Sequence, residues 1–346
     1  MIDFDIKNKI NAKYLELFNF PIVEIGEYND TKYFDLFPKK TILSSLFEDI
    51  LSVTGYDYDL IVIVRVNAIG ESYILNYLYD EIKRKNKADK ICFVLHNENK
   101  KYESMFKMFS DVDVFNVPIS IKHLNALLKK NFYIYKNKKF IVYHTTVDNA
   151  TKYLKYKRHY VETLKKYMNV KKLTKKEIKI SEDNIEKIKK IDLNFEKFIF
   201  INPETKSTKK LDDSFWFSII NELKKLGYDI YINTASGKSV FGKSEKLSFS
   251  EAITLASYAK AIITMRTGFS EILTQINVPV FAIYTEMGLI GFKTKANPEK
   301  MFELTTLKKY PYADENLIYE YIYKNNNQEL LNNIILNLQG AENEKN

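Results

Sequence analysis

The chain has 346 residues, 45% of them hydrophobic and 14% aromatic, which is enough for two domains with separate cores and argues against a disordered chain. A net charge of +9 attracts anionic partners, but no DNA- or RNA-binding motif accompanies the lysines, so nucleic acid is not an expected partner. A single cysteine excludes a disulfide framework and a thiolate metal cage.

Residues 1–55 are predicted to form an N-terminal helical extension ahead of the first sheet. The opening residues, MIDFDIKNKI, lack the basic segment followed by an apolar run that marks an export signal. No apolar run approaches the roughly 18 residues that a membrane helix needs. We therefore expect a cytoplasmic protein.

Residues 56–180 alternate short apolar runs with longer helical patterns. The apolar runs in chain order are LIVIVRV, KICFVLHN, DVDVFNV and KKFIVYHT. A helix is predicted over residues 71–85, after the first run. Strands that are apolar throughout, joined by crossovers of a dozen or more residues, indicate a parallel sheet covered on both faces. We predict an α/β, Rossmann-like doubly wound domain.

Residues 181–346 repeat the pattern and end in a tail helix, so a second doubly wound domain is predicted, joined to the first near residues 175–195. Its strand-like runs are KFIFINP, DIYINTAS, AIITMRTG and VPVFAIYTE. Ser248 and Glu251 have the spacing of a capping box. Asp212 and Asp213 open the preceding helix, and Gly227 closes it.

Two strand ends are the best candidates for a binding site, because open α/β sheets bind ligands outside the carboxyl ends of their strands. One is the turn from Asn67 through Gly70 to Glu71, and the other runs from Arg266 to Glu271. Neither is a GxGxxG fingerprint or a P-loop, which disfavours nicotinamide cofactors and P-loop ATP hydrolysis.

The order of the motifs resembles that of glycosyltransferases of the heptosyltransferase type, glycosyltransferase family 9. LIVIVRVNAIGESYILNYLYDEIKRK resembles the family's opening strand, turn and helix. FIFINPETKSTKKLDDSFW is similar to its lysine-containing loop before a Trp-bearing helix. LSFSEAITLASYAKAIITMRTGFSEILTQINVPVFAIYTE resembles its Thr-Gly nucleotide-sugar loop. The resemblance spans residues 59–290.

The resemblance implies the GT-B architecture, two Rossmann-like doubly wound domains that face each other across a cleft. It also implies an inverting, metal-independent glycosyltransferase with no cofactor, which moves a sugar from a nucleotide-sugar donor. The acceptor would be a hydroxyl of a bacterial surface glycan or glycolipid, of the lipopolysaccharide or capsule type.

Glu71 is the candidate catalytic base, since it stands where the family has an aspartate and transfer to a hydroxyl requires a base near the attacking oxygen. Asn67 and Gly70 form the turn before it. Cationic side chains and backbone N–H groups would stabilise the departing diphosphate. The candidate donor-binding residues are Lys206, Ser207, Lys209, Lys210, Arg266, Thr267, Gly268 and Glu271. Arg266 and Glu271 depart from the family, which usually has aspartate and histidine there.

Structural explanations stand beside these roles. The helix dipole alone favours Glu71, and Arg266 is open to pairing with Glu271 or Glu286. The lysine loop, residues 206–210, is equally well explained as a polar loop that faces solvent. Trp216 and Phe217 are expected in the core rather than on a nucleobase. Two Asp-x-Asp triplets, at residues 57–59 and 111–113, directly precede strands and give little support to a metal site.

The lysine-rich stretch from Lys152 to Lys190 is interpreted mainly as a solvated helix face and linker. The alternative is a surface, around Lys152 to Lys176, that lies against anionic lipid headgroups of the inner membrane or an anionic glycan. Two other function classes stay open because fold alone does not decide function: a sugar-nucleotide epimerase, and a non-catalytic partner subunit.

Overall fold

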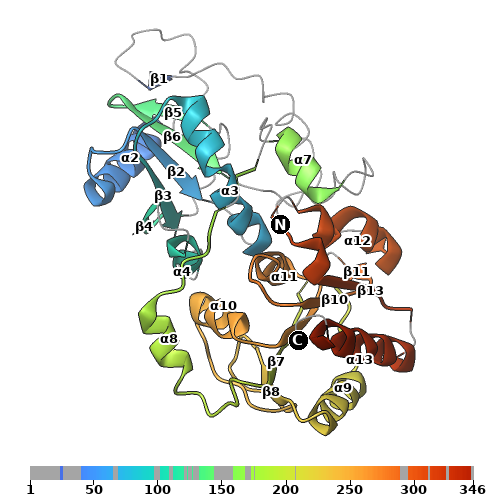
Figure 1. Cartoon of the computed structure of the whole chain (residues 1–346). Coiled ribbons are helices and arrows are strands. Elements are labelled where there is room, and N and C mark those ends of the chain that lie inside the picture. Colours follow the sequence, from blue (N-terminus) through green and yellow to red (C-terminus); the bar gives the residue numbers. More distant parts are fainter. Residues whose placement is uncertain are drawn as a thin grey trace. The chain divides into compact units, whose positions relative to one another are not determined.

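A computed structural model describes most of the chain between residues 24 and 343. The described residues are 24–25, 40–64, 69–96, 102–108, 112–120, 123, 127, 132–143, 159–167, 173–174, 176–206, 208–288, 295–310, 312–324 and 327–343. The chain divides into two compact units (Figure 1). The first comprises Met1–Asn149 and Lys165–Thr174, and the second Ala150–Leu164 and Lys175–Asn346. The last boundary between the units follows Thr174, next to the junction that the sequence suggested near residues 175–195.

The first unit contains a mixed sheet whose described strands run in the order β1-β5-β6-β2-β3-β4. Their bounds are β1 (Glu24–Ile25), β2 (Leu60–Val64), β3 (Ile91–His96), β4 (Asp113–Val117), β5 (Phe132–Tyr135) and β6 (Lys138–Tyr143). The pairs around β2 and β3 are parallel, as predicted. β5 and β6 form an antiparallel hairpin that the sequence did not reveal. Its turn residues, Lys136 and Asn137, have φ of 46° and 60°, as a tight hairpin requires.

The helices described on this sheet include α2 (Lys40–Thr54), α3 (Ile69–Asn86) and α4 (Glu103–Lys107). α2 buries Leu46, Phe47 and Ile50 in the same apolar cluster as Ile61 of β2. It therefore forms part of the first domain's core rather than a separate extension. α3 begins two residues before the helix predicted over residues 71–85.

The second unit contains a parallel sheet in the order β13-β10-β9-β7-β8. Its strands are β7 (Phe198–Asn202), β8 (Asp229–Ile232), β9 (Ala261–Met265), β10 (Val280–Tyr284) and β13 (Ile318–Ile322). Every residue of β7, β9 and β10 is buried, as expected of strands covered on both faces. The prediction of two Rossmann-like doubly wound sheets is confirmed.

Helices connect these strands and cover both faces of the sheet (Figure 1). The connecting elements are α9 (Asp213–Lys225), α10 (Phe249–Ser257), α11 (Gly268–Leu273), α12 (Pro298–Thr305), η4 (Leu307–Lys309), η5 (Glu315–Leu317) and the small ladder of β11 (Met287–Gly288) with β12 (Lys295–Ala296). The terminal helix is α13 (Asn327–Asn343), and α7 (Tyr160–Tyr167) and α8 (Glu182–Ile188) precede the sheet.

The predicted helix ends in this unit are confirmed. Ser248 caps α10 in a reciprocal capping box with Glu251, which also pairs with Lys187 of α8 at 3.0 Å. α9 begins at Asp213, and Gly227 follows it with a φ of 81°.

α9 and α13 share one apolar cluster with one face of the sheet. Trp216 is buried there, as predicted. Phe217 is not: its side chain is 44% exposed, and it packs edge-on against Phe241 with ring centroids 5.0 Å apart. The prediction for Phe217 was wrong because consecutive helical residues point about 100° apart, so a neighbour of a core residue often faces solvent.

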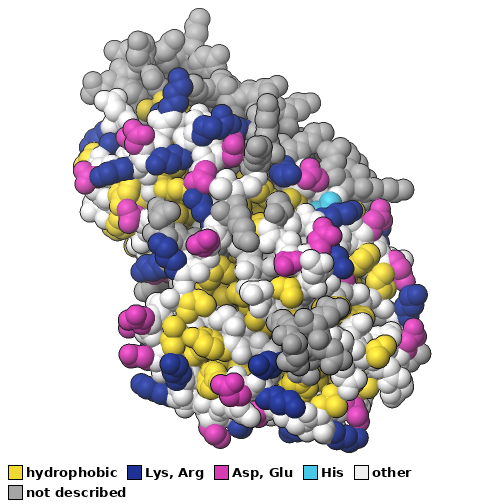
Figure 2. Space-filling model, in the orientation of Figure 1, with side chains coloured by type: hydrophobic (Ala, Val, Ile, Leu, Met, Phe, Trp, Pro, Cys, Tyr) yellow, Lys and Arg dark blue, Asp and Glu magenta, His cyan; other side chains and the backbone are white. Residues whose placement is uncertain are grey.

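The surface mixes charges of both signs. Lysine, arginine and acidic side chains are interspersed on the face shown in Figure 2. Among the helices in the described part of the chain, none is both long enough and apolar enough to cross a membrane.

Phe215 and Phe217 offer a matched test of this packing. Phe215 is 1% exposed and contacts Trp216 edge-on, so Phe215→Ala should lower the free energy of unfolding by about 3–5 kcal/mol. Phe217→Ala should cost less than about 1 kcal/mol, because a half-exposed ring leaves no cavity. Urea unfolding followed by fluorescence of Trp216, the single tryptophan, measures both. Equal losses would contradict the assigned orientation of α9.

Candidate functional site

The strand order of the second sheet defines one place where a ligand is expected. From β7 the chain moves to β8 on one side, and then returns to β9 on the other side of β7. Such a reversal leaves a crevice at the carboxyl ends of the two strands, where open α/β sheets bind ligands. The segments that leave β7 and β9 at this point contain the predicted residues Lys206–Lys210 and Arg266–Glu271.

The first sheet reverses in the same way at β2, which has β3 on one side and β6 on the other. α3 follows β2, and it places Gly70 and Glu71 in its first turn at this point. Gly70 is buried. Asn67 and the side chain of Glu71 lie outside the described residues.

The lysine loop after β7 is fixed by its backbone. The N–H of Lys209 donates to the carbonyl of Glu286 at 2.7 Å, and its carbonyl accepts from the hydroxyl of Thr285 at 2.6 Å. Both partners directly follow β10, so the loop reaches across the end of β9. The side chains of Lys206, Lys209 and Lys210 are exposed, and their ammonium groups have no ion-pair partner among the described residues. Ser207 lies outside those residues.

The turn after β9 is closed by its own side chains. Thr267 caps α11: its hydroxyl accepts from the N–H of Ser270 at 3.4 Å, and the Ser270 hydroxyl accepts from the N–H of Thr267 at 3.1 Å. The Ser270 hydroxyl also donates to the Thr267 carbonyl at 2.7 Å. Gly268 is the first residue of α11. The turn therefore has a defined shape before any ligand is considered.

A row of polar side chains that the sequence did not indicate runs along the carboxyl ends of β8, β7 and β9. Asn233 donates to Asn202 at 2.9 Å, Asn202 donates to the hydroxyl of Thr264 at 3.2 Å, and Thr264 donates to the carbonyl of Met265 at 2.9 Å. The last acceptor is a carbonyl, which cannot donate, so the direction of the whole row is fixed. The available signal was a polar residue at the end of three successive apolar runs.

Arg266 does not present a free guanidinium. Its side chain is 5% exposed, and Nη2 donates to Oε1 of Glu271, which is 6% exposed, at 2.9 Å. The pairing with Glu271 that the sequence left open is therefore the one observed. Both side chains are almost fully buried, so direct contact of either with a donor would require it to become exposed.

His159 joins the same buried region from the short segment that precedes α7. Its Nε2 lies 3.1 Å from the carbonyl of Thr306, and its Nδ1 accepts from the N–H of Val161 at 3.3 Å, so Nε2 carries the proton. Burial is the largest cause that lowers the pKa of His159, to about 4, and the charges of Lys309 and Arg266 act in the same direction.

One residue of each acidic triplet forms hydrogen bonds within the fold, and Asp111 lies outside the described residues. Asp59 accepts from the backbone N–H groups of Asp89 and Lys90 at 2.8 and 3.0 Å, and Asp113 accepts from the hydroxyl of Tyr58 at 2.8 Å. Within the described part of the chain, no group of three or more His, Cys, Asp or Glu side chains is arranged to hold a metal ion.

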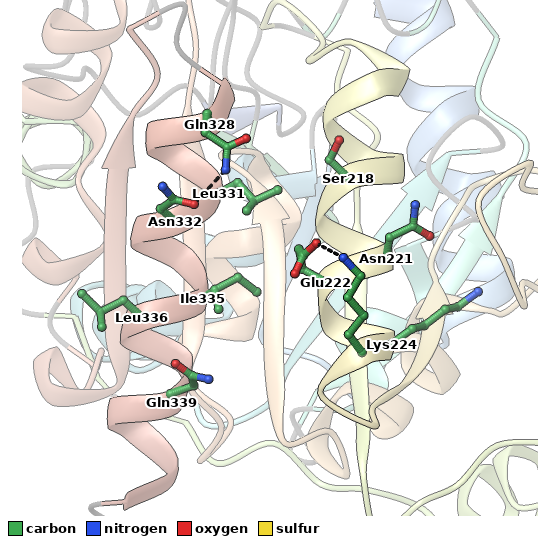
Figure 3. A pocket seen from close by; sticks show the side chains of 11 residues that line it. Ser218, Asn221, Glu222, Lys224, Gln328, Leu331, Asn332, Ile335, Leu336 and Gln339 are labelled. Carbon is green, nitrogen blue, oxygen red and sulfur yellow. Dashed lines mark hydrogen bonds and ion pairs between the residues drawn. The ribbon is translucent and has the colours of Figure 1, made fainter.

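A groove of about 1080 Å³ lies elsewhere, between α9 and α13 (Figure 3). Leu331 and Ile335 point from α13 into the space between the helices (Figure 3). Two hydrogen-bonded pairs, Gln328 with Asn332 and Lys225 with Glu222, are among the residues that line the groove. None of the predicted site residues contributes to it.

Comparison with known proteins rests on structure alone, since no family model and no curated protein sequence matches the chain. A glycosyl transferase family 9 protein from Veillonella parvula matches with a TM-score of 0.51 and 11% identity, over 83% of this chain and 99% of that one. ADP-heptose LPS heptosyltransferase II from E. coli matches with a TM-score of 0.52 and 12% identity, over 82% and 99%. The likeness confirms a fold of two Rossmann-like domains, as in GT-B glycosyltransferases of family 9.

The lowered pKa of His159 predicts a specific pH dependence of stability. The unfolded chain protonates this histidine near pH 6.5 but the folded protein only near pH 4, so stability falls as the pH drops through that window. His159→Gln removes the titration and keeps a donor for Thr306, so the slope between pH 6.5 and 4 should flatten by up to about 1.4 kcal/mol per pH unit. Urea unfolding over a pH series measures this. Above pH 7 the two slopes should agree, and parallel curves throughout would contradict the assignment.

Proposed function

We propose that the chain is a glycosyltransferase that binds a nucleotide-sugar at the carboxyl ends of β7 and β9 and transfers the sugar to a hydroxyl acceptor. The main support for this proposal is that two separate observations agree: the sequence motifs and the strand order of the two sheets. The motifs that resembled family 9 in sequence order lie, in a fold similar to solved family 9 structures, at the positions where each sheet reverses its strand order.

The exposed lysines supply what a departing diphosphate needs. Lys206, Lys209 and Lys210 stand on a loop whose backbone is held across the end of β9, and no described carboxylate pairs with their ammonium groups. Cations placed where negative charge develops are a main source of catalysis in group transfer. We propose that these lysines do this work without a divalent cation or other cofactor.

Glu71 is the proposed general base. In the first turn of α3 it stands at the carboxyl edge of the first sheet, where an acceptor hydroxyl would be bound. Deprotonation of that hydroxyl lets its oxygen attack the anomeric carbon from the side opposite the nucleotide, which inverts the configuration at that carbon. The proton goes to the carboxylate, and the bond to the diphosphate breaks.

The proposed acceptor is a bacterial surface glycan or glycolipid of the lipopolysaccharide or capsule type. A cytoplasmic enzyme would meet such a lipid-linked acceptor at the inner face of the membrane. The stretch Lys152–Lys176, proposed to lie against anionic headgroups there, falls partly outside the described residues. This acceptor class rests on the resemblance to family 9.

Nucleotide binding tests the donor site. We expect a set of nucleoside diphosphates and nucleotide-sugars, each without and with magnesium, to contain one that raises the melting temperature without the metal. Lys209→Met should weaken its affinity by about tenfold or more, since a charge-assisted hydrogen bond contributes about 1.5–3 kcal/mol. Lys260→Met is the matched control: Lys260 is also exposed but precedes β9, at the opposite edge of the sheet. No stabilisation by any nucleotide would contradict the proposal.

Turnover tests the base. Glu71→Gln should reduce the transfer rate by about 10²–10⁴-fold and leave nucleotide affinity unchanged, because proton transfer by a placed carboxylate accounts for a factor of that size. Glu81→Gln, ten residues further along α3, controls for helix effects. A Glu71→Gln protein with full transfer rate would remove Glu71 from this role.

The same assays separate the other function classes. Conversion of a nucleotide-sugar with no added acceptor would identify a sugar-nucleotide epimerase. Binding without turnover across a panel of acceptors would identify a non-catalytic partner subunit.

A further inference from the structure

One guanidinium connects the donor-site turn to a distant backbone segment. Arg266 Nη1 donates to the carbonyl of Thr267 at 2.7 Å, and its Nε donates to the carbonyl of Thr305 at 2.9 Å. Thr267 caps α11, and Thr305 ends α12, 38 residues later. The planar, forked guanidinium can hold two acceptors at a fixed separation, which a lysine ammonium cannot do.

The third nitrogen of the guanidinium, Nη2, contacts Glu271 and Tyr310. Nη2 donates to Oε1 of Glu271 at 2.9 Å and to the hydroxyl of Tyr310 at 3.2 Å. The other carboxylate oxygen, Oε2 of Glu271, is buried and has no hydrogen-bond partner. The negative charge of Glu271 is thus matched to Arg266, and removal of either partner would leave the other charge buried and uncompensated.

The segment to which Arg266 is tied is itself fixed to the sheet. The hydroxyl of Tyr284 donates to the carbonyl of Thr305 at 3.2 Å. Glu320 of β13 accepts from the hydroxyl of Thr306 at 2.6 Å and from the N–H of Leu307 at 2.7 Å. The corner between α12 and η4 is therefore anchored to β10 and β13, and Arg266 extends that anchor to the turn after β9.

From these contacts we infer that Arg266 and Glu271 are positioning residues: together they hold the Thr267–Gly268 turn in the shape that the donor site needs, and neither contacts the diphosphate. This inference rests on the proposed function. The positive charge that meets the diphosphate then comes from the exposed lysines of the loop after β7. Arg266 and Glu271, which both differ from the residues that the resemblance implies, act as one pair.

Two substitutions separate positioning from direct contact. If Arg266 bound phosphate and Glu271 merely competed for it, Glu271→Gln would leave the affinity for a nucleoside diphosphate equal or tighter. Positioning predicts that Glu271→Gln weakens it by about 10- to 100-fold, as expected when a site is displaced by about 1 Å. Arg266→Lys keeps a point charge that suffices for phosphate, yet it should lose as much affinity as Arg266→Met, because lysine cannot bridge Thr267 and Thr305.

The experiment is calorimetric titration of each variant with ADP and UDP at 10 °C, in low and high salt. A purely structural role would lower the melting temperature and leave affinity at 10 °C unchanged, which would overturn the inference. Arg266→Lys should leave the salt dependence of affinity as in the wild type, since the charge of Arg266 is already neutralised, whereas Lys209→Met should reduce it. Glu222→Gln, in an exposed pair with Lys225, is the matched control and should bind like the wild type.

Equal or tighter binding by Glu271→Gln would overturn this inference alone. Absence of binding by the wild-type protein would overturn the proposed function, and the inference with it. The two failures are therefore distinguishable.

Discussion

Parallel pairing of strands that are buried on both faces is the constraint on which this structure depends. Such strands carry few polar side chains along their length, so polar and charged groups gather near the strand ends and in the segments that leave them. The second sheet shows the result: Asn202 is the last residue of β7, Thr264 is the last but one of β9, and Arg266 and the lysine loop follow at the same edge. Reversal of the strand order beside β7 then brings two of these segments together.

At this edge of the sheet, exposed and buried positive charges lie on different segments. The ammonium groups on the loop after β7 are exposed and available to an anion, while the guanidinium after β9 is buried and already neutralised. Arg266 and Glu271 both differ from the residues that the resemblance to family 9 implies, and they contact each other, so each provides the buried charge that the other needs. In this account they shape the site, and the ligand meets the lysines and the backbone of the turn.

The sequence was sufficient for what depends on local pattern. Continuous apolar runs predicted the parallel strands, and the spacing of Ser248 and Glu251 predicted a cap. It was not sufficient for features that depend on contacts between segments far apart in the sequence. The contacts of Arg266 come from α11, α12 and Tyr310. The hairpin of β5 with β6 depends on pairing across the sheet, and α2 joins the first core through Phe47. Prediction of the polar row through Asn202 would have required the strand order, because that order determines which strand ends are neighbours.

The measurement that tests the account most directly is the structure of the protein with a bound nucleoside diphosphate. We predict that the diphosphate lies at the carboxyl ends of β7 and β9, within hydrogen-bond reach of Lys209 and of the backbone N–H groups after Thr267, with the pair of Arg266 and Glu271 intact. A diphosphate bound elsewhere, for example in the groove between α9 and α13, or one held by Arg266 with that pair broken, would contradict it.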